Sequence, residues 1–321
     1  MSLAEKGMKR STIKMLIRNK IEDWLKTLPE GLRADISENI IVTGGCIPSM
    51  LLGEKINDYD IYFRNKASAV LVAKHYCKRF INEADAKNGV SRSINPEVRL
   101  ETKKNIKGEE EERVTIWIQS AGAVGTQQEE YQYFEGCSES TASSFIESLS
   151  LEETASLAET LKSDKKDKYR PVFLSQNAVT LSDKLQLITR FYGEPEQIHK
   201  NFDYVHATCY YDYAKDSLTL PAEALEALLS KTLIYRGSLY PLASVFRTRK
   251  FIERGWRITA GQMLKILWQI SEIDLNDRDV LQEQLLGVDS TYMLHLIAEL
   301  RDVQGKVDAT YLAKLIDDIF E

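Results

Sequence analysis

Residues 43–61 read TGGCIPSMLLGEKINDYDI, and this stretch decides the fold that we expect for the chain. The β-branched run at 39–43 predicts a strand, which ends at the glycine pair Gly44-Gly45. A short helix over Cys46–Leu52 follows at once, and a second strand is predicted over Asp58–Arg64. The stretch therefore predicts a strand–turn–helix–strand unit that carries a glycine pair and an acidic pair.

The acidic pair, Asp58 and Asp60, indicates a metal site. Residues two apart on a strand point to the same face, so both carboxylates converge. Two carboxylates a few ångströms apart repel each other unless a cation lies between them, and Mg²⁺ prefers oxygen ligands. Gly44 and Gly45 allow a phosphate to approach the backbone beside a helix N-terminus.

Each half of this pattern has an ordinary alternative. A lone glycine pair is usually a turn, and a lone Asp-x-Asp is usually a solvated strand or turn. The spacing of the two within one strand–helix–strand unit is what favours the functional interpretation.

Composition limits the class of protein further. The chain has 321 residues, 43% of them hydrophobic and 28% charged, which favours two folded domains. The net charge of −6 excludes a protein whose main task is to coat nucleic acid. The spacing of four cysteines and four histidines favours neither a disulfide scaffold nor zinc. No apolar run is long enough to cross a bilayer, and the first ten residues lack the apolar stretch of a secretory leader. We therefore expect a soluble, cytoplasmic protein with no membrane partner.

Working outward, we expect an α+β fold: a mixed sheet with helices over 1–236, followed by an all-α domain over 237–321. A polar stretch at 138–168 is interpreted as an insertion. Helices are predicted at 11–28, 67–81, 195–202, 241–254, 260–273, 277–286, 290–303 and 309–320. Strands are predicted at 98–102, 113–119, 171–174, 178–181 and 203–211, and 185–192 fits a strand or a helix.

The motif residues Gly44–Gly53 and Asn57–Ile61 resemble the signature of the DNA polymerase β-type nucleotidyltransferases. The resemblance is closest to the head domain of bacterial poly(A) polymerases and CCA-adding enzymes. Two looser blocks follow in the family's order: the stretch Asp203–Asp212, and a basic helix with Arg247 and Lys250.

This resemblance implies an Mg²⁺-dependent nucleotidyltransferase. Such an enzyme moves a nucleoside monophosphate from an NTP (ATP or CTP) to a hydroxyl, here on an RNA 3′ end, and releases pyrophosphate. Asp58 and Asp60 would hold the metal, with Asp203 as the favoured third carboxylate and Asp183 and Glu101 as alternatives.

The nucleotide-binding residues implied by the resemblance are Gly44, Gly45 and Ser49 near the phosphates, and Arg247 and Lys250 on the basic helix. A solvated helix face is the alternative interpretation of that helix.

Two alternative functions stay open. Pro48-Ser49 and Asn201-Phe202 stand where the family usually has arginine-containing pairs, which favours a catalytically reduced binding or assembly module. Nucleotidylation of a protein or small molecule is the other.

Overall fold

The computed structural model describes residues 7–88, 94–104, 108, 110–120, 168–174, 177–275, 277, 280–281, 284, 310 and 313–314. The predicted insertion at 138–168 lies outside the described residues apart from Lys168. The same is true of the predicted helix 290–303 and of most of 277–286 and 309–320.

The chain divides into two compact units. Unit 1 comprises residues 1–103, 110–198 and 209–220, and unit 2 comprises 104–109, 199–208 and 221–321. The predicted boundary after residue 236 stays a prediction.

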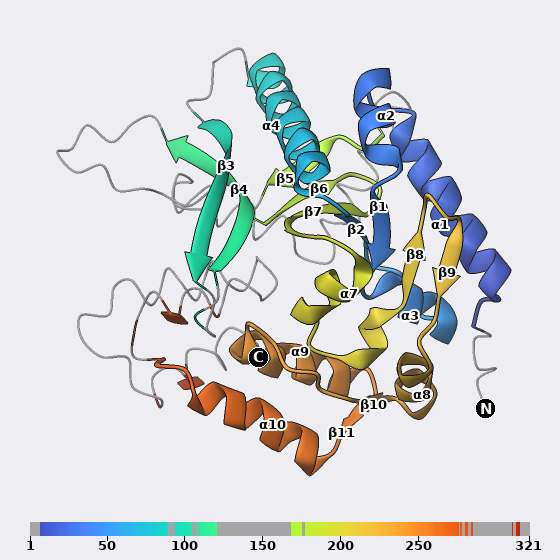
Figure 1. The fold of residues 1–321 in the computed structure, drawn as a ribbon, viewed down its shortest axis with the longest axis vertical. Coiled ribbons are helices and arrows are strands. Elements are labelled where there is room, and N and C mark those ends of the chain that lie inside the picture. The colour runs from blue at the N-terminus through green and yellow to red at the C-terminus, as the bar shows by residue number, and fades with distance from the viewer. Residues whose placement is uncertain are drawn as a thin grey trace. The chain divides into compact units, whose positions relative to one another are not determined.

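A mixed sheet forms the centre of unit 1 (Figure 1). Within the described part of the chain it has seven strands, and the one parallel pair is β2 with β7. In spatial order the strands are β5 (Pro171–Leu174), β6 (Ala178–Leu181), β7 (Leu185–Tyr192), β2 (Tyr59–Phe63), β1 (Ile40–Thr43), β8 (Tyr210–Asp212) and β9 (Ser217–Thr219).

The two faces of this sheet differ in polarity. Val42 pairs with Ile61, which pairs with Leu187, and all three side chains are buried. One position along, Thr43 pairs with Asp60, which pairs with Gln186. Because neighbouring positions on a strand point to opposite faces, the apolar row belongs to the core and Asp60 projects from the other face.

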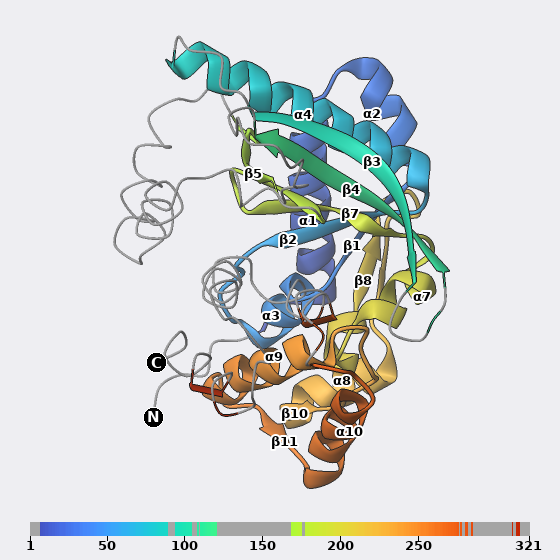
Figure 2. The same cartoon turned by 90° about the vertical axis from the view of Figure 1, so that its left-hand side faces the viewer.

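Helices cover the apolar side of the strands. Helix α1 (Arg10–Leu25) buries a stripe of residues spaced three or four apart: Ile13, Ile17, Ile21, Trp24 and Leu25. Helix α4 (Lys66–Asn88) lies along β7 and β2 (Figure 2). Trp24 Nε1 donates a hydrogen bond of 2.8 Å to Tyr76 Oη, which joins α1 to α4 inside the core.

Unit 1 contains several further elements. Pro29 lies between α1 and helix α2 (Glu30–Ser37), as the residue just before α2. Between β1 and β2 lies α3 (Cys46–Leu52), which Gly53 ends in the left-handed conformation. The remaining elements are α7 (Pro195–Ile198) and the paired strands β3 (Ile94–Lys104) and β4 (Glu110–Ser120).

Unit 2 contains both helices and strands. Its helices are α8 (Ala222–Ser230), α9 (Pro241–Glu253) and α10 (Ala260–Ser271), with 3₁₀ turns at His199–Asn201 and Val205–Thr208. Strands β10 (Thr232–Leu233) and β11 (Arg257–Ile258) pair in parallel.

The mixed α+β class and the mixed sheet are confirmed, whereas an all-α C-terminal domain is not. The predicted strand at 203–211 is wrong over most of its length. A 3₁₀ turn occupies Val205–Thr208, closed by a 2.8 Å hydrogen bond from Thr208 Oγ1 to the Val205 carbonyl, and β8 starts only at Tyr210. Local hydrogen bonding outweighs the strand preference of these residues here.

No helix in the described ranges has the length and apolar character that crossing a bilayer requires.

Candidate functional site

The acidic pair lies where the sequence places it, at the start of β2. Asp60 is the second residue of β2, and its strand partner is Thr43, the last residue of β1. Asp58 comes just before β2, so the strand is shorter than predicted. Asp58 is exposed and Asp60 is half-buried.

Gly44 makes the close approach between β1 and Asp60 possible. Its φ of +97° lies in the region that L-residues rarely adopt. A Cβ built on Gly44 would lie 2.7 Å from Asp60 Oδ2, so the space beside the backbone is taken by the carboxylate. A glycine is therefore required at this position on both counts.

The two acidic groups influence each other's charge. Burial raises the pKa of Asp60 well above its usual value, and the neighbouring Asp58 carboxylate raises that pKa further. Burial likewise raises the pKa of the Cys46 thiol, with smaller contributions from Asp60 and Asp58. The negative charge of ionised Asp60 is therefore unfavourable in this environment. Binding of a cation or a proton would reduce that free-energy cost.

The other predicted phosphate contacts lie on the neighbouring helix. Gly45 precedes α3, and Ser49 lies within it and is buried. The backbone N–H of Ser49 donates to the Gly45 carbonyl at 3.1 Å. That Gly44, Gly45 and Ser49 bind phosphate stays a prediction.

In the described ranges, the protein side chains do not make up a full set of metal ligands by themselves. Within the residues that the structure describes, no group of three or more His, Cys, Asp or Glu side chains is arranged to hold a metal. Mg²⁺ is commonly bound through one or two carboxylates and keeps several waters, so the Asp58–Asp60 pair fits this ion.

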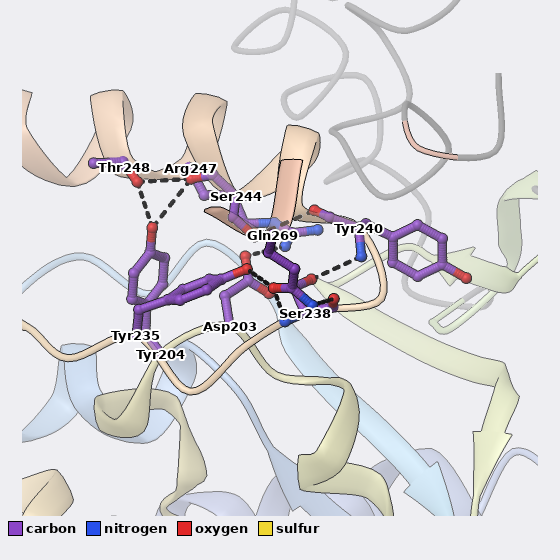
Figure 3. Close-up of polar contacts among 9 residues, drawn as sticks. All are labelled: Asp203, Tyr204, Tyr235, Ser238, Tyr240, Ser244, Arg247, Thr248 and Gln269. Atoms are coloured by element: carbon purple, nitrogen blue, oxygen red, sulfur yellow. Dashed lines mark hydrogen bonds and ion pairs between the residues drawn. The ribbon is translucent and has the colours of Figure 1, made fainter. Parts of the chain in front are cut away.

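Asp203, the favoured third carboxylate, belongs to unit 2 and pairs there with Arg247 (Figure 3). Its side chain is 6% exposed and that of Arg247 is 34% exposed. The Asp203 carbonyl also accepts a 2.7 Å hydrogen bond from the Arg236 backbone N–H. Two residues predicted to act separately, one on metal and one on phosphate, are therefore partners; both of those roles stay predictions.

A polar network surrounds this ion pair in Figure 3. Tyr204 Oη hydrogen-bonds with Thr248 Oγ1 and donates to the Ser244 carbonyl at 3.1 Å. Tyr235 Oη donates to Gln269 Oε1 at 2.6 Å. The tyrosine hydroxyls join α9 and α10 to the segments before them, which indicates that the network serves to hold unit 2 together.

The remaining candidates are Lys250, Asp183 and Glu101. Lys250 follows on α9, half-buried. Asp183, an alternative third carboxylate, lies in the turn between β6 and β7, with φ +62°. Glu101 lies on β3.

Sequence reasoning missed Lys184, which contacts the segment before Asp58. Its Nζ donates to the Ile56 carbonyl at 2.9 Å, across 128 residues of sequence. The short turn between two apolar runs at 178–181 and 185–192 was the available signal, but the contact depends on the parallel register of β7 and β2.

Substitution of Gly44 is predicted to destabilise unit 1. Gly44→Ala combines an unfavourable φ with a 2.7 Å approach to Asp60, and we expect a loss of about 1–3 kcal/mol in unfolding free energy. Gly45→Ala is the matched control, because its Cβ meets nothing within 4 Å and φ is −73°. Urea unfolding measures both, and equal stability of the two variants would contradict this role of Gly44.

Substitution of Arg247 is predicted to destabilise unit 2. Arg247→Ala leaves the buried Asp203 carboxylate without its guanidinium partner, and we expect a loss of roughly 3 kcal/mol. The control is Arg249→Ala, which removes an exposed pair with Glu253 and should cost under about 0.5 kcal/mol. Thermal unfolding compares the two, and a loss for Arg247→Ala no larger than the control's would show that the pair contributes little.

The comparisons with known proteins indicate a different family from the one that the motif resembles. The family model described as Gabija anti-defense 2 family protein matches residues 15–231, more than half of the chain. A curated relative, Gabija anti-defense 2 of Bacillus phage SPbetaL7, is 22% identical over 107 residues. That region is 33% of this chain and 27% of the relative, so the match spans about a quarter of the relative's length. No solved structure matches the chain significantly.

These findings correct the predicted recognition. The resemblance to nucleotidyltransferases and to poly(A) polymerase head domains was wrong as a family assignment, and nothing in the family match supports nucleotidyl transfer to RNA or RNA binding. The alternatives of a reduced nucleotidyltransferase module and of protein or small-molecule nucleotidylation are no better supported. The NTP partner stays a prediction. By the extent of the family match, the chain belongs to the Gabija anti-defense 2 family.

Proposed function

We propose that this chain counteracts the Gabija defence of the cell in which it is made. The observation that carries the proposal is the family match over residues 15–231, which includes the central sheet of unit 1. The curated relative of the same name comes from a phage, which supports a role in overcoming host defence. Such a role would be exercised in the cytoplasm.

We place the functional centre at Asp58 and Asp60, which lie inside the matched range. Asp60 is a desolvated carboxylate with a second carboxylate beside it, an arrangement that lowers stability when both are ionised. Strongly perturbed acidic groups cluster at functional sites for this reason. Gly44 also supports this functional centre. Its unusual backbone conformation, without a side chain, leaves room for the Asp60 carboxylate.

Mg²⁺ is the cofactor that we propose for this pair. Two carboxylate oxygens match its preference for hard ligands, and the cation would neutralise the charge that raises the Asp60 pKa. When bound, the ion would supply Lewis-acid chemistry, which is the basis for proposing that the chain is an enzyme. The residues of the chain would hold and orient it: Asp60 from β2, Asp58 from the segment before it, and Gly44 by leaving room.

The anti-defence role is tested by phage plating. In a host that expresses Gabija, co-expression of the wild-type chain should restore plating of a Gabija-sensitive phage to the level of a Gabija-free host. Asp58→Asn and Asp60→Asn keep the side-chain shape and remove the charge, so they should abolish the rescue while the protein stays folded.

Asp35→Asn is the matched control for the plating test, because Asp35 is exposed on α2 and outside the site. Failure of the wild type to rescue plating would refute the anti-defence proposal. Full rescue by Asp60→Asn would leave the anti-defence role intact and refute the proposed functional centre.

The cation site is tested by metal- and pH-dependent unfolding. With Mn²⁺ at 100 times its Kd, the wild type should gain about 2.7 kcal/mol, and Asp60→Asn should gain nothing. Because the folded-state pKa of Asp60 is raised, its ionisation lowers stability as pH rises from the ordinary value of about 3.9 towards the raised value.

It follows that Asp60→Asn without metal should be more stable than the wild type at neutral pH, and that this advantage should vanish at low pH. The Mn²⁺ effect should also weaken as pH falls through the raised pKa, since protons compete for the carboxylate. If Mn²⁺ leaves the unfolding free energy of the wild type unchanged at neutral pH, the proposed cation site is refuted.

A further inference from the structure

The segment that carries Asp58 has no regular secondary structure. Residues 54–58 join α3 to β2, and something outside the segment must fix the direction in which Asp58 points. At its start, the Glu54 backbone N–H donates to the Ser49 carbonyl at 2.8 Å. At its end, the Tyr59 backbone N–H donates to the Lys184 carbonyl at 2.8 Å. Between these points, the Ile56 carbonyl accepts from Lys184 Nζ at 2.9 Å.

A single residue, Lys184, therefore contacts the chain on both sides of Asp58. Its carbonyl holds residue 59 and its ammonium group holds residue 56. The parallel register, in which Tyr59 pairs with Leu185, places Lys184 alongside Asp58. One further step along the same register, Asp60 pairs with Gln186.

The turn that presents Lys184 has an unusual backbone. Ser182–Lys184 connects β6 to β7, and both Asp183 (φ +62°) and Lys184 (φ +61°) are left-handed. Glycine or asparagine would adopt this conformation at lower cost. Lys20 Nζ from α1 donates to the Asp183 carbonyl, so the turn is held from a second element.

Strain of this kind is retained where the surrounding structure uses it. A glycine at 184 would relax the turn but would remove the amine that holds Ile56. A glycine at 183 would relax the turn without removing this contact, because the contact to Ile56 comes from the Lys184 side chain.

We propose that Lys184 is a positioning residue for the Asp58–Asp60 site: through its carbonyl and its ammonium group it fixes the segment that aims Asp58 at the cation. The inference rests on the proposed function, since it assumes that the acidic pair binds a divalent ion. Lys184 itself holds protein backbone and does not contact the cation.

The test compares Lys184→Gly with Asp183→Gly, which relieve the same backbone strain at neighbouring positions. Mn²⁺ alone is the probe, and its Kd is measured by electron paramagnetic resonance alongside the melting temperature without metal. Both variants should keep or raise the melting temperature. Lys184→Gly should weaken Mn²⁺ binding about 10–100-fold, as the loss of groups that orient metal ligands does. Asp183→Gly should bind Mn²⁺ clearly more tightly than Lys184→Gly does, because it keeps the Lys184 amine.

Two further variants make the result specific to the ammonium group. Lys184→Met keeps the side-chain length and should weaken Mn²⁺ as Lys184→Gly does, and it replaces that variant if the glycine fails to fold. Lys184→Arg keeps a donor and should recover most of the affinity. Plating in the Gabija-expressing host should follow the same order as Mn²⁺ affinity.

Wild-type affinity in Lys184→Gly or Lys184→Met would overturn the positioning role, as would equal weakening in Asp183→Gly. A wild-type protein that fails to bind Mn²⁺ would instead refute the cation site on which the inference rests, so the two failures are distinguishable.

Discussion

The approach of the Asp60 carboxylate to the backbone of Gly44 is the constraint on which the site depends. Pairing of Thr43 with Asp60 brings the end of β1 against β2, and a side chain at position 44 would collide with Oδ2 at 2.7 Å. Burial of the carboxylate raises its pKa, and the neighbouring Asp58 raises that pKa further. The apolar row Val42–Ile61–Leu187 on the opposite face fixes the register, because a slip by one residue would bury Asp60 in the core.

Much of this part of the fold was predictable from the sequence. The β-branched run before Gly44, the short helix after it and the position of the acidic pair all follow from local patterns, and the structure has them within one residue or so. The stripe of α1 was equally clear from its spacing. Local signals sufficed because each element carries its own periodicity or stop residue.

Other features depend on contacts that sequence does not display. The segment after Asp203 has strand-forming residues, yet a 3₁₀ turn forms there. Asp203 pairs with Arg247, which lies 44 positions away in the sequence. Lys184 contacts Ile56, which lies 128 positions away. The family assignment failed for a related reason. A glycine pair followed by an acidic pair reports a local arrangement of strand, helix and strand, and the wider match over 15–231 assigns the chain to a different family.

The proposed cation site between Asp58 and Asp60 is tested most directly by the anomalous scattering of a crystal soaked in Mn²⁺. We predict an anomalous peak about 2 Å from oxygens of both carboxylates at neutral pH. Absence of a peak at this pair under saturating Mn²⁺, with both side chains ordered, would contradict it.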